Sequence, residues 1–159
     1  MFDVAVTYLL RHGARGTEVL LGEKLTGLGA GKIVGPGGKL EPGESAAQAA
    51  AREVEEEVGV LVRPDDLRRV ARLAYEFPHR PAWSQRSTAF LAEVWTGEPR
   101  ASSELAPRWY PIDALPLERM WDDARRWLPR VLTGERISVD CSYADDNDTV
   151  ATWVEAPLD

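Results

Sequence analysis

Three glutamates with the spacing of metal ligands stand close together in the middle of this sequence. Glu53, Glu56 and Glu57 are three and four residues apart, which puts them within about 100° of arc on the polar side of a helix. Like charges at this spacing destabilise a helix by roughly 0.2 to 0.5 kcal/mol per pair, so a cation nearby would stabilise them. Carboxylate oxygens are the ligands that Mg²⁺ and Mn²⁺ prefer, and the cluster predicts a divalent metal site. A solvated acidic helix face is the alternative.

Three features distinguish this helix from an ordinary acidic one. Arg52 can reach Glu56 one turn further along and hold its carboxylate in position. Between Gly27 and Gly43, seven of the seventeen residues are glycine, which excludes a regular helix and lets the backbone approach a ligand closely. The acidic face also borders the apolar stripe of the helix rather than opposing it. Together these features favour a binding site over plain solvation.

The helix that carries the glutamates has clear start and stop signals. Ser45, followed three residues later by Gln48, forms a capping box, and Gly59 can end the helix in a left-handed conformation. The sequence therefore predicts a helix over residues 45–58, directly after the glycine-rich loop.

The rest of the chain is predicted to form strands and one more helix. Apolar patterns bounded by turn residues predict strands at 2–10, 17–22, 68–77, 86–95, 106–111, 136–143 and 149–155. The helical spacing of Trp121, Trp127 and Val131 predicts a helix over 120–132, which Pro129 should kink or shorten. This irregular alternation indicates a layered α+β domain, not a helix bundle.

Length and composition bound the possible functions. The 159 residues, 44 % hydrophobic and 28 % charged, are typical of one globular domain over 1–159. A net charge of −7 argues against binding of extended nucleic acid, and Val4–Leu10 is too short to cross a membrane. Cys141, the only cysteine, excludes an internal disulfide. We expect a cytoplasmic protein with no membrane partner, as a monomer or homodimer.

The run from Gly38 to Val60 resembles the signature of the Nudix family. It fits the pattern Gly, five residues, Glu, seven residues, Arg-Glu-aliphatic-x-Glu-Glu-x-Gly-aliphatic at every fixed position. The resemblance implies a Nudix fold, an α/β/α sandwich in which a mixed β-sheet lies between helices and carries the loop-helix motif. It also implies hydrolysis of a nucleoside diphosphate linked to another group.

The resemblance implies roles for the signature residues. Mg²⁺, or Mn²⁺ in its place, would be bound by these groups: the carbonyl of Gly37 and the carboxylates of Glu53, Glu56 and Glu57. Glu44 and Arg52 would orient the glutamates and so belong with them to the catalytic set. Gly38 and Lys39 would face the phosphates.

Beyond the signature the chain is similar to the MutT-type branch of the family, including its animal members. That branch hydrolyses oxidised purine nucleoside triphosphates to the monophosphate and pyrophosphate. Three segments carry the similarity: Gly27–Lys32, Ser103–Pro116 and Met120–Asp123. It implies that Glu104 is a further metal ligand, that Trp121 stacks on the base and that Asp123 hydrogen-bonds to it. Without the similarity, Glu104 would be an exposed loop residue and Trp121 a core residue.

Two positions on the base side depart from that branch. Val34 replaces an asparagine that hydrogen-bonds to the base, and Ala124 replaces a second aspartate. Each change removes hydrogen-bonding capacity from the base site. We place Val34 and Leu28 among the base-contacting residues, and the identity of the base and of the sugar stays open.

The predicted activity is Mg²⁺-dependent hydrolysis of nucleoside triphosphates, with sanitation of oxidised purines such as 8-oxo-dGTP as its role. Alternatives are hydrolysis of ADP-ribose, a nucleotide sugar or a dinucleoside polyphosphate, none of which releases inorganic pyrophosphate. A binding domain without catalysis usually lacks a signature glutamate, and none is missing here. The segment Phe77–Arg86 is longer than its family counterpart and is predicted either to overhang the site or to form a solvated loop.

Overall fold

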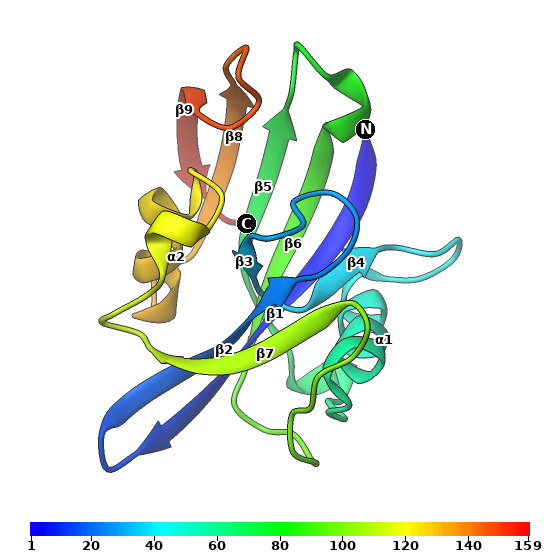
Figure 1. Ribbon diagram of the computed structural model, residues 1–159, viewed down its shortest axis with the longest axis vertical. Coiled ribbons are helices and arrows are strands. Elements are labelled where there is room, and N and C mark those ends of the chain that lie inside the picture. Colours follow the sequence, from blue (N-terminus) through cyan, green and yellow to red (C-terminus); the bar gives the residue numbers. More distant parts are fainter.

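A curved mixed sheet with one helix on each face makes up the protein, for which a computed structural model describes all residues, 1–159 (Figure 1). The strands are β1 (Phe2–Gly13), β2 (Gly16–Lys24), β3 (Ile33–Val34), β4 (Gly37–Lys39), β5 (Arg68–Glu76), β6 (Gln85–Ala92), β7 (Leu105–Pro111), β8 (Ile137–Tyr143) and β9 (Val150–Pro157). The helices are α1 (Ala46–Val58) and α2 (Ala124–Leu132), and short 3-10 turns occupy Pro64–Asp66, Pro81–Trp83 and Leu117–Arg119. Neither helix combines the length and the apolar character that a membrane span requires.

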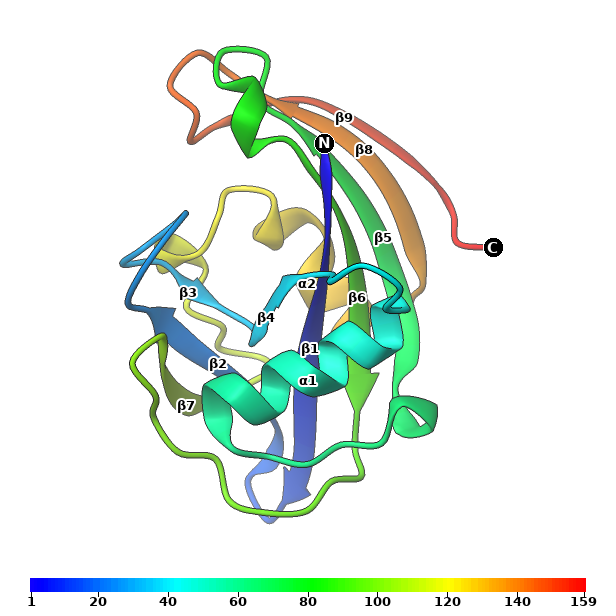
Figure 2. The same ribbon diagram turned by 90° about the vertical axis from the view of Figure 1, so that its right-hand side faces the viewer.

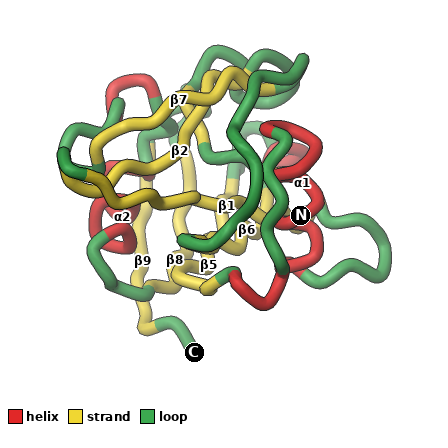
Figure 3. The backbone as a smooth tube through the Cα atoms, turned by 90° about the horizontal axis from the view of Figure 1, so that it is seen from below, coloured by secondary structure: helices red, strands yellow, loops and turns green.

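The sheet has the order β3-β2-β1-β6-β5-β8-β9, with β4 paired to β1 and β7 paired to β2. The β1–β6 and β5–β8 pairs are parallel and the remaining pairs are antiparallel. Helix α1 lies in front of the sheet and α2 behind it (Figure 2), and the view from below shows the strands between the two helices (Figure 3). The predicted mixed sheet between helices is confirmed.

Strand β1 divides the core because its alternate side chains enter two different layers. Leu9 packs with Val54 and Val58 of α1, whereas Tyr8 on the other face packs with Trp127 of α2. The Tyr8 and Trp127 rings meet edge to face with centroids 6.0 Å apart. Burial of each such side chain contributes on the order of 2 kcal/mol, so the central strand holds both helices on the sheet.

Helix α1 begins and ends where the sequence predicts. The Ser45 hydroxyl accepts from the backbone N–H of Gln48 over 3.1 Å, and the Gln48 side chain accepts from the Ser45 N–H over 2.9 Å. Gly59 ends the helix with a φ of 72°. One detail of the helical-wheel prediction is wrong: Glu57 is only 7 % exposed and lies in the buried stripe with Val54, because the glycine-rich loop covers this side of the helix.

The second helix is shorter than predicted and begins at Ala124 instead of Met120. Met120 is extended (φ −99°, ψ 167°), because it follows the 3-10 turn that ends at Arg119. Asp123 precedes the helix but makes no side-chain cap, since its carboxylate binds side chains from the sheet. Pro129 lies inside the helix, which ends three residues later.

Within the predicted glycine loop the structure adds two short strands, β3 and β4. Strand β4 pairs with β1 so closely that a Cβ on Gly37 would lie 2.4 Å from the carbonyl oxygen of Ala5. Only glycine allows this approach. The Gly-Gly-Lys composition of β4 carries no strand propensity, so local sequence could not predict it.

Candidate functional site

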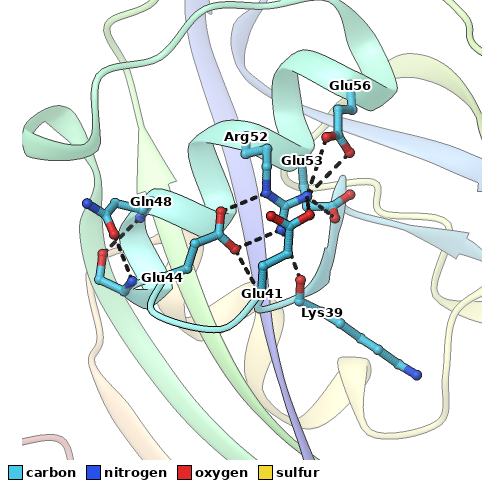
Figure 4. Close-up of polar contacts among 8 residues, drawn as sticks. Lys39, Glu41, Glu44, Gln48, Arg52, Glu53 and Glu56 are labelled. Atoms are coloured by element: carbon cyan, nitrogen blue, oxygen red, sulfur yellow. Dashed lines mark hydrogen bonds and ion pairs between the residues drawn. The ribbon is translucent and has the colours of Figure 1, made fainter.

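Arg52 lies at the centre of a carboxylate network where the glycine-rich loop meets α1 (Figure 4). Its Nε and Nη2 donate to the two carboxylate oxygens of Glu44 over 2.7 and 2.9 Å, a bidentate pair. Nη1 donates to Glu53 Oε1 over 2.8 Å, and Nη2 donates to the carbonyl of Lys39 over 3.0 Å. One guanidinium group therefore ties the loop to the helix and orients the Glu53 carboxylate.

Arg52 affects the two carboxylates that it binds differently. Hydrogen bonds from its guanidinium group hold the pKa of Glu44 well below the ordinary value, at about 2, so Glu44 stays ionised. For Glu53, burial raises the pKa and only part of this rise is offset by the hydrogen bond from Arg52. Glu44 thus serves as a permanent partner for Arg52, whereas Glu53 carries a charge that further positive charge would stabilise.

Two glycines let the loop backbone press against the glutamates of α1. A Cβ on Gly38 would lie 2.5 Å from the Glu53 carboxylate carbon, a distance that no side chain could occupy. The N–H of Gly37 donates to Glu57 Oε1 over 2.8 Å. The loop therefore leaves the carboxylates fixed against it, with the backbone of Gly37 beside them.

Glu53, Glu57 and Glu104 each bring a carboxylate oxygen within 4.8 Å of the others, and this group is called the carboxylate cluster below. Burial, together with repulsion from Glu53 and Glu104, raises the pKa of Glu57 to about 7, against the hydrogen bond from Gly37. Three converging hard oxygen donors, one of them buried, are the donor set that a divalent cation requires. The residues present thus fit such an ion.

Glu104 reaches the cluster through long-range strand pairing. Strand β7 pairs with β2 from Pro111 opposite Glu18 to Leu105 opposite Lys24, and Glu104 precedes β7 directly. The ladder continues one step further, because the N–H of Leu25 donates to the carbonyl of Glu104 over 2.9 Å. The pairing brings Glu104 beside α1 although they are far apart in the chain.

Glu56 lies outside the carboxylate cluster. Its side chain is 55 % exposed and its carboxylate accepts from Arg52 Nη1 over 3.3 and 3.5 Å. Glu56 therefore binds the same guanidinium group as Glu53 and adds no oxygen to the carboxylate cluster. Its role as a metal ligand stays a prediction.

Two lysines flank the cleft beside the cluster. Lys39 is exposed and its side chain extends away from the Arg52 network (Figure 4), with Nζ 4.4 Å from the ring centroid of Phe2. Lys24 lines the cleft itself, together with Gly38 and Glu57. Lys24 was not identified from the sequence, because the pairing of β2 with β7, which places the end of β2 at the cluster, is not a local property of the chain.

A second cavity, of about 140 Å³ and mostly apolar, lies between the sheet and the segment that precedes α2; it is called the apolar pocket below. Its walls include Ile33, Phe77, Met120, Trp121 and Ala124. The apolar pocket and the cleft at the cluster share two lining residues, Val6 and Gln85, so the two sites adjoin. One elongated ligand could occupy both.

Trp121 is half-buried at the mouth of the apolar pocket. Phe77, Trp83 and Tyr143 meet its ring edge to face, with centroids 5.8 to 6.4 Å away. The Nζ of Lys32 lies 4.7 Å from the ring centroid of Trp121. Trp121 thus combines partial packing with a position that a ligand ring could reach.

Asp123 lines the apolar pocket but is occupied by protein donors. The Tyr75 hydroxyl and the Trp127 indole N–H donate to its Oδ2 over 3.0 and 2.8 Å, and the Tyr143 hydroxyl donates to its Oδ1. Burial raises its pKa, and these hydrogen bonds oppose the rise. Neither tyrosine was identified from the sequence, although the alternation of apolar residues in β5 directs Tyr75 to this face.

Val34 and Leu28 do not line the apolar pocket with Asp123. Val34 lines the cleft at the cluster, with Lys24 and Glu57, and its neighbour Ile33 lines the apolar pocket instead. Leu28 lies in a loop near Trp83 and Trp121, at the outer side of the apolar pocket. The structure thus brings Trp121 and Asp123 together, with Leu28 outside them and Val34 on the side of the cluster.

The segment from Phe77 to Arg86 overhangs this region, as one of the two predictions had it. It joins β5 to β6, and its Trp83 packs edge to face on Phe77 with centroids 5.7 Å apart. The guanidinium carbon of Arg80 lies over the Trp83 ring, 4.4 Å from its centroid. Together with Lys32 and Asp148 this segment surrounds an outer cleft next to Trp121.

Comparisons with known proteins agree with this architecture. The domain family described as "NUDIX domain" matches residues 1–131. "Oxidized purine nucleoside triphosphate hydrolase" of Danio rerio is 41 % identical over 119 residues, 75 % of this chain and 74 % of that protein. The protein of the same name from Mus musculus is 34 % identical over 136 residues, 86 % of this chain and 85 % of that protein.

Solved structures share the fold. The crystal structure of a mutator MutT protein from Bacillus halodurans has a TM-score of 0.80 and 24 % identity over the whole length of both chains. The crystal structure of an Ap4A hydrolase binary complex from C. elegans has a TM-score of 0.64 and 21 % identity, and covers 84 % of this chain and 96 % of that one. At this identity the likeness concerns the fold alone.

Proposed function

The chain belongs to the Nudix domain family and is a Nudix hydrolase, and from this premise we propose that it hydrolyses nucleoside triphosphates with Mg²⁺. The proposed products are the nucleoside monophosphate and pyrophosphate. The proposed substrates are oxidised purine nucleotides such as 8-oxo-dGTP, because two curated relatives at 34 and 41 % identity are named as oxidised purine nucleoside triphosphate hydrolases.

The observation that carries this proposal is the adjacency of two unlike sites. The carboxylate cluster suits an ion that binds phosphate oxygens, and the apolar pocket beside it suits a flat aromatic ring. Val6 and Gln85 line both sites, so a nucleotide could extend from one to the other. A phosphatase for small phosphate esters does not need an apolar pocket beside its metal site.

In the proposed site, these groups would hold Mg²⁺ or Mn²⁺: the carboxylates of Glu53, Glu56, Glu57 and Glu104, and the carbonyl of Gly37. When bound, such an ion neutralises phosphate oxygens and lowers the pKa of a coordinated water. Arg52 and Glu44 keep Glu53 oriented, and a cluster carboxylate accepts the proton of the attacking water. Lys24 and Lys39, with the backbone of Gly38, line a neighbouring cleft that suits the phosphates.

The proposed base site uses the apolar pocket and its mouth. Trp121 offers a ring face for stacking, and Leu28 and Val34 contact the nucleotide from the loop side.

We further propose that residues 1–159 form one Nudix domain in the cytoplasm. In support, β8 and β9 lie beyond the matched residues 1–131 yet extend the same sheet.

A panel of nucleotides tests the proposal. We expect pyrophosphate release from 8-oxo-dGTP with Mg²⁺, faster than from dGTP, and loss of release when a chelator removes the ion. ADP-ribose, a nucleotide sugar and a dinucleoside polyphosphate form the second arm. Preferential hydrolysis of one of these, without inorganic pyrophosphate, would contradict the triphosphate assignment and keep the family. Equal turnover of 8-oxo-dGTP and dGTP would contradict the sanitising role alone.

A further inference from the structure

We propose that Gln85 and Ser87, and not the carboxylate of Asp123, supply the hydrogen bonds that select the base in the apolar pocket. This inference rests on the proposed function, because it assigns a specificity to the same nucleotide site. It concerns two residues of β6 that carry no part of the family signature.

Asp123 has little capacity left for a ligand. Tyr75, Trp127 and Tyr143 all donate to its carboxylate, and its own N–H donates to the Tyr143 hydroxyl over 3.3 Å. A carboxylate has about four lone-pair sites, so three are engaged by the protein. The residue is only 4 % exposed. Asp123 therefore anchors the segment before α2 on β5 and β8.

Gln85 and Ser87 have the hydrogen-bonding capacity that Asp123 lacks. The Ser87 hydroxyl makes no hydrogen bond within the protein, although the residue is 5 % exposed and lines the pocket. Gln85 donates only from Nε2 to the carbonyl of Trp83, over 3.3 Å. Its Oε1 and its second N–H remain unpaired. Because the Ser87 hydroxyl and the remaining groups of the Gln85 amide have no protein partner, a ligand can pair with them without breaking a hydrogen bond inside the protein.

The two side chains are placed to meet a ring in the apolar pocket. They are two residues apart on β6, so both face the pocket, and Gln85 lies directly opposite Tyr75 in the register with β5. Ser87 lines only the apolar pocket, whereas Gln85 also lines the cleft at the carboxylate cluster. A ring held by its phosphates at the cluster would meet Gln85 first and Ser87 deeper inside.

The chemistry of these groups defines the base that they select. An amide and a hydroxyl each offer a donor and an acceptor, whereas a carboxylate offers acceptors alone. The pair therefore suits the five-membered-ring edge of 8-oxoguanine, where the 8-oxo group lies next to N7–H, whereas unmodified guanine offers only the N7 acceptor at that edge. An edge with only acceptors would leave Gln85 Oε1 unpaired.

Calorimetric binding of nucleoside monophosphates tests the inference without turnover. The probes are 8-oxo-dGMP, dGMP, dAMP and 8-oxo-GMP, titrated into the wild type, Gln85→Met, Ser87→Ala and Thr88→Val. Methionine keeps the length of the glutamine side chain without its hydrogen bonds, and Thr88→Val is the matched control on the opposite face of β6. We expect Gln85→Met and Ser87→Ala each to weaken 8-oxo-dGMP binding about three- to tenfold and to reduce its preference over dGMP. Thr88→Val should bind as the wild type does.

Several outcomes would overturn the inference. One is an unchanged ranking of the bases in Gln85→Met and Ser87→Ala; another is a change only in the ranking of 8-oxo-dGMP against 8-oxo-GMP, which would assign Gln85 to the sugar. A third is a wild type that binds none of the four probes. Failure of the proposed function is distinguishable, because base-selective binding without pyrophosphate release would contradict only the triphosphatase activity.

Discussion

At the scale of single residues, the site depends on the Glu57 carboxylate, whose ionised form is destabilised by burial until a cation binds beside it. Glu57 is buried, accepts one hydrogen bond from Gly37 and faces two further glutamates. Its pKa of about 7 reflects burial first and repulsion second. A group of this kind is typical of sites that bind positive charge, because its ionised form is stable only when a partner is bound.

Removal of one cluster charge should abolish most of the turnover. We expect Glu53→Gln to lower kcat/KM at least about 100-fold, because the amide cannot replace a charged metal ligand. Glu55→Gln is the matched control: it lies on the same helix, is exposed and makes no side-chain hydrogen bond. Pyrophosphate release measures both variants. Equal activities would contradict the placement of catalysis at the cluster.

Glu57 should also make the stability of the metal-free protein depend on pH. Its folded pKa of about 7 lies above the ordinary 4.5, so its protonated form stabilises the fold below about pH 4.5. This stabilisation, of order 1 to 3 kcal/mol, should disappear as the pH rises through about 7.

Urea unfolding in chelator between pH 4.5 and 8 measures this effect as the difference between the wild type and Glu57→Gln. Glutamine does not titrate, so the variant should lack this part of the decline, while other groups act equally on both proteins. Parallel curves for the two proteins would contradict the shifted pKa of Glu57. Added Mg²⁺ should stabilise the wild type more at pH 8 than at pH 5.

At the scale of elements, the site is a close contact between a loop strand and a helix. Strand β4 pairs with β1 and its Gly38 lies against Glu53 of α1, and Arg52 connects the loop to the helix through Glu44 and the carbonyl of Lys39. The capping box at Ser45 starts the helix at a defined residue, which sets the rotation of the glutamates about the helix axis. Small backbone shifts here would therefore move the cluster.

Gly38→Ala tests this contact. The added Cβ would lie 2.5 Å from the Glu53 carboxylate carbon, so Glu53 or β4 must move. We expect a loss of at least about tenfold in kcat/KM and weaker Mg²⁺ binding by calorimetry. Gly13→Ala is the control, because nothing lies within 4 Å of its Cβ and its φ is not in the left-handed region. If both variants behaved as the wild type does, the close approach would have no functional importance.

At the scale of the whole molecule, Tyr143 of β8 completes the wall of the apolar pocket, and the β8–β9 hairpin contacts the segment before α2. Tyr143 at the end of β8 donates to Asp123, and the N–H of Val150 in β9 donates to Asp122 Oδ2 over 2.9 Å. Lys32 in the glycine-rich loop pairs with Asp148 of the β8–β9 turn at 2.9 Å. Segments from both ends of the chain thus enclose the region next to Trp121.

Tyr143→Phe should weaken this closure. Loss of its hydroxyl removes one of three donors from a buried carboxylate, and we expect a decrease of about 1 to 3 kcal/mol in the free energy of unfolding. Tyr110→Phe is the matched control, since the Tyr110 hydroxyl makes no hydrogen bond and we expect a change below about 0.5 kcal/mol. Denaturant unfolding compares the two. Equally small losses of unfolding free energy in the two variants would show that only the ring of Tyr143, and not its hydroxyl, contributes to stability.

The sequence by itself determined the features that depend on neighbours in the chain. The limits of α1, with its Ser45 cap and Gly59 end, follow from local rules, and so does the grouping of Glu53 with Glu57 on consecutive turns. The family signature lies within one loop and one helix for the same reason. Most strands are likewise predictable, since alternation of side chains is a local property.

Only the tertiary structure decided what long-range pairing brings together. The β2–β7 ladder places Glu104 and Lys24 at the cluster, a meeting that residue patterns could not show, although family resemblance assigned Glu104. The packing of the loop on α1 buries Glu57, contrary to the helical wheel. Tyrosines from β5 and β8 occupy Asp123, so Gln85 and Ser87 are the polar groups of the pocket with hydrogen-bonding capacity left for a ligand. These contacts join residues far apart in the chain, and local periodicity carries no information about which strands become neighbours.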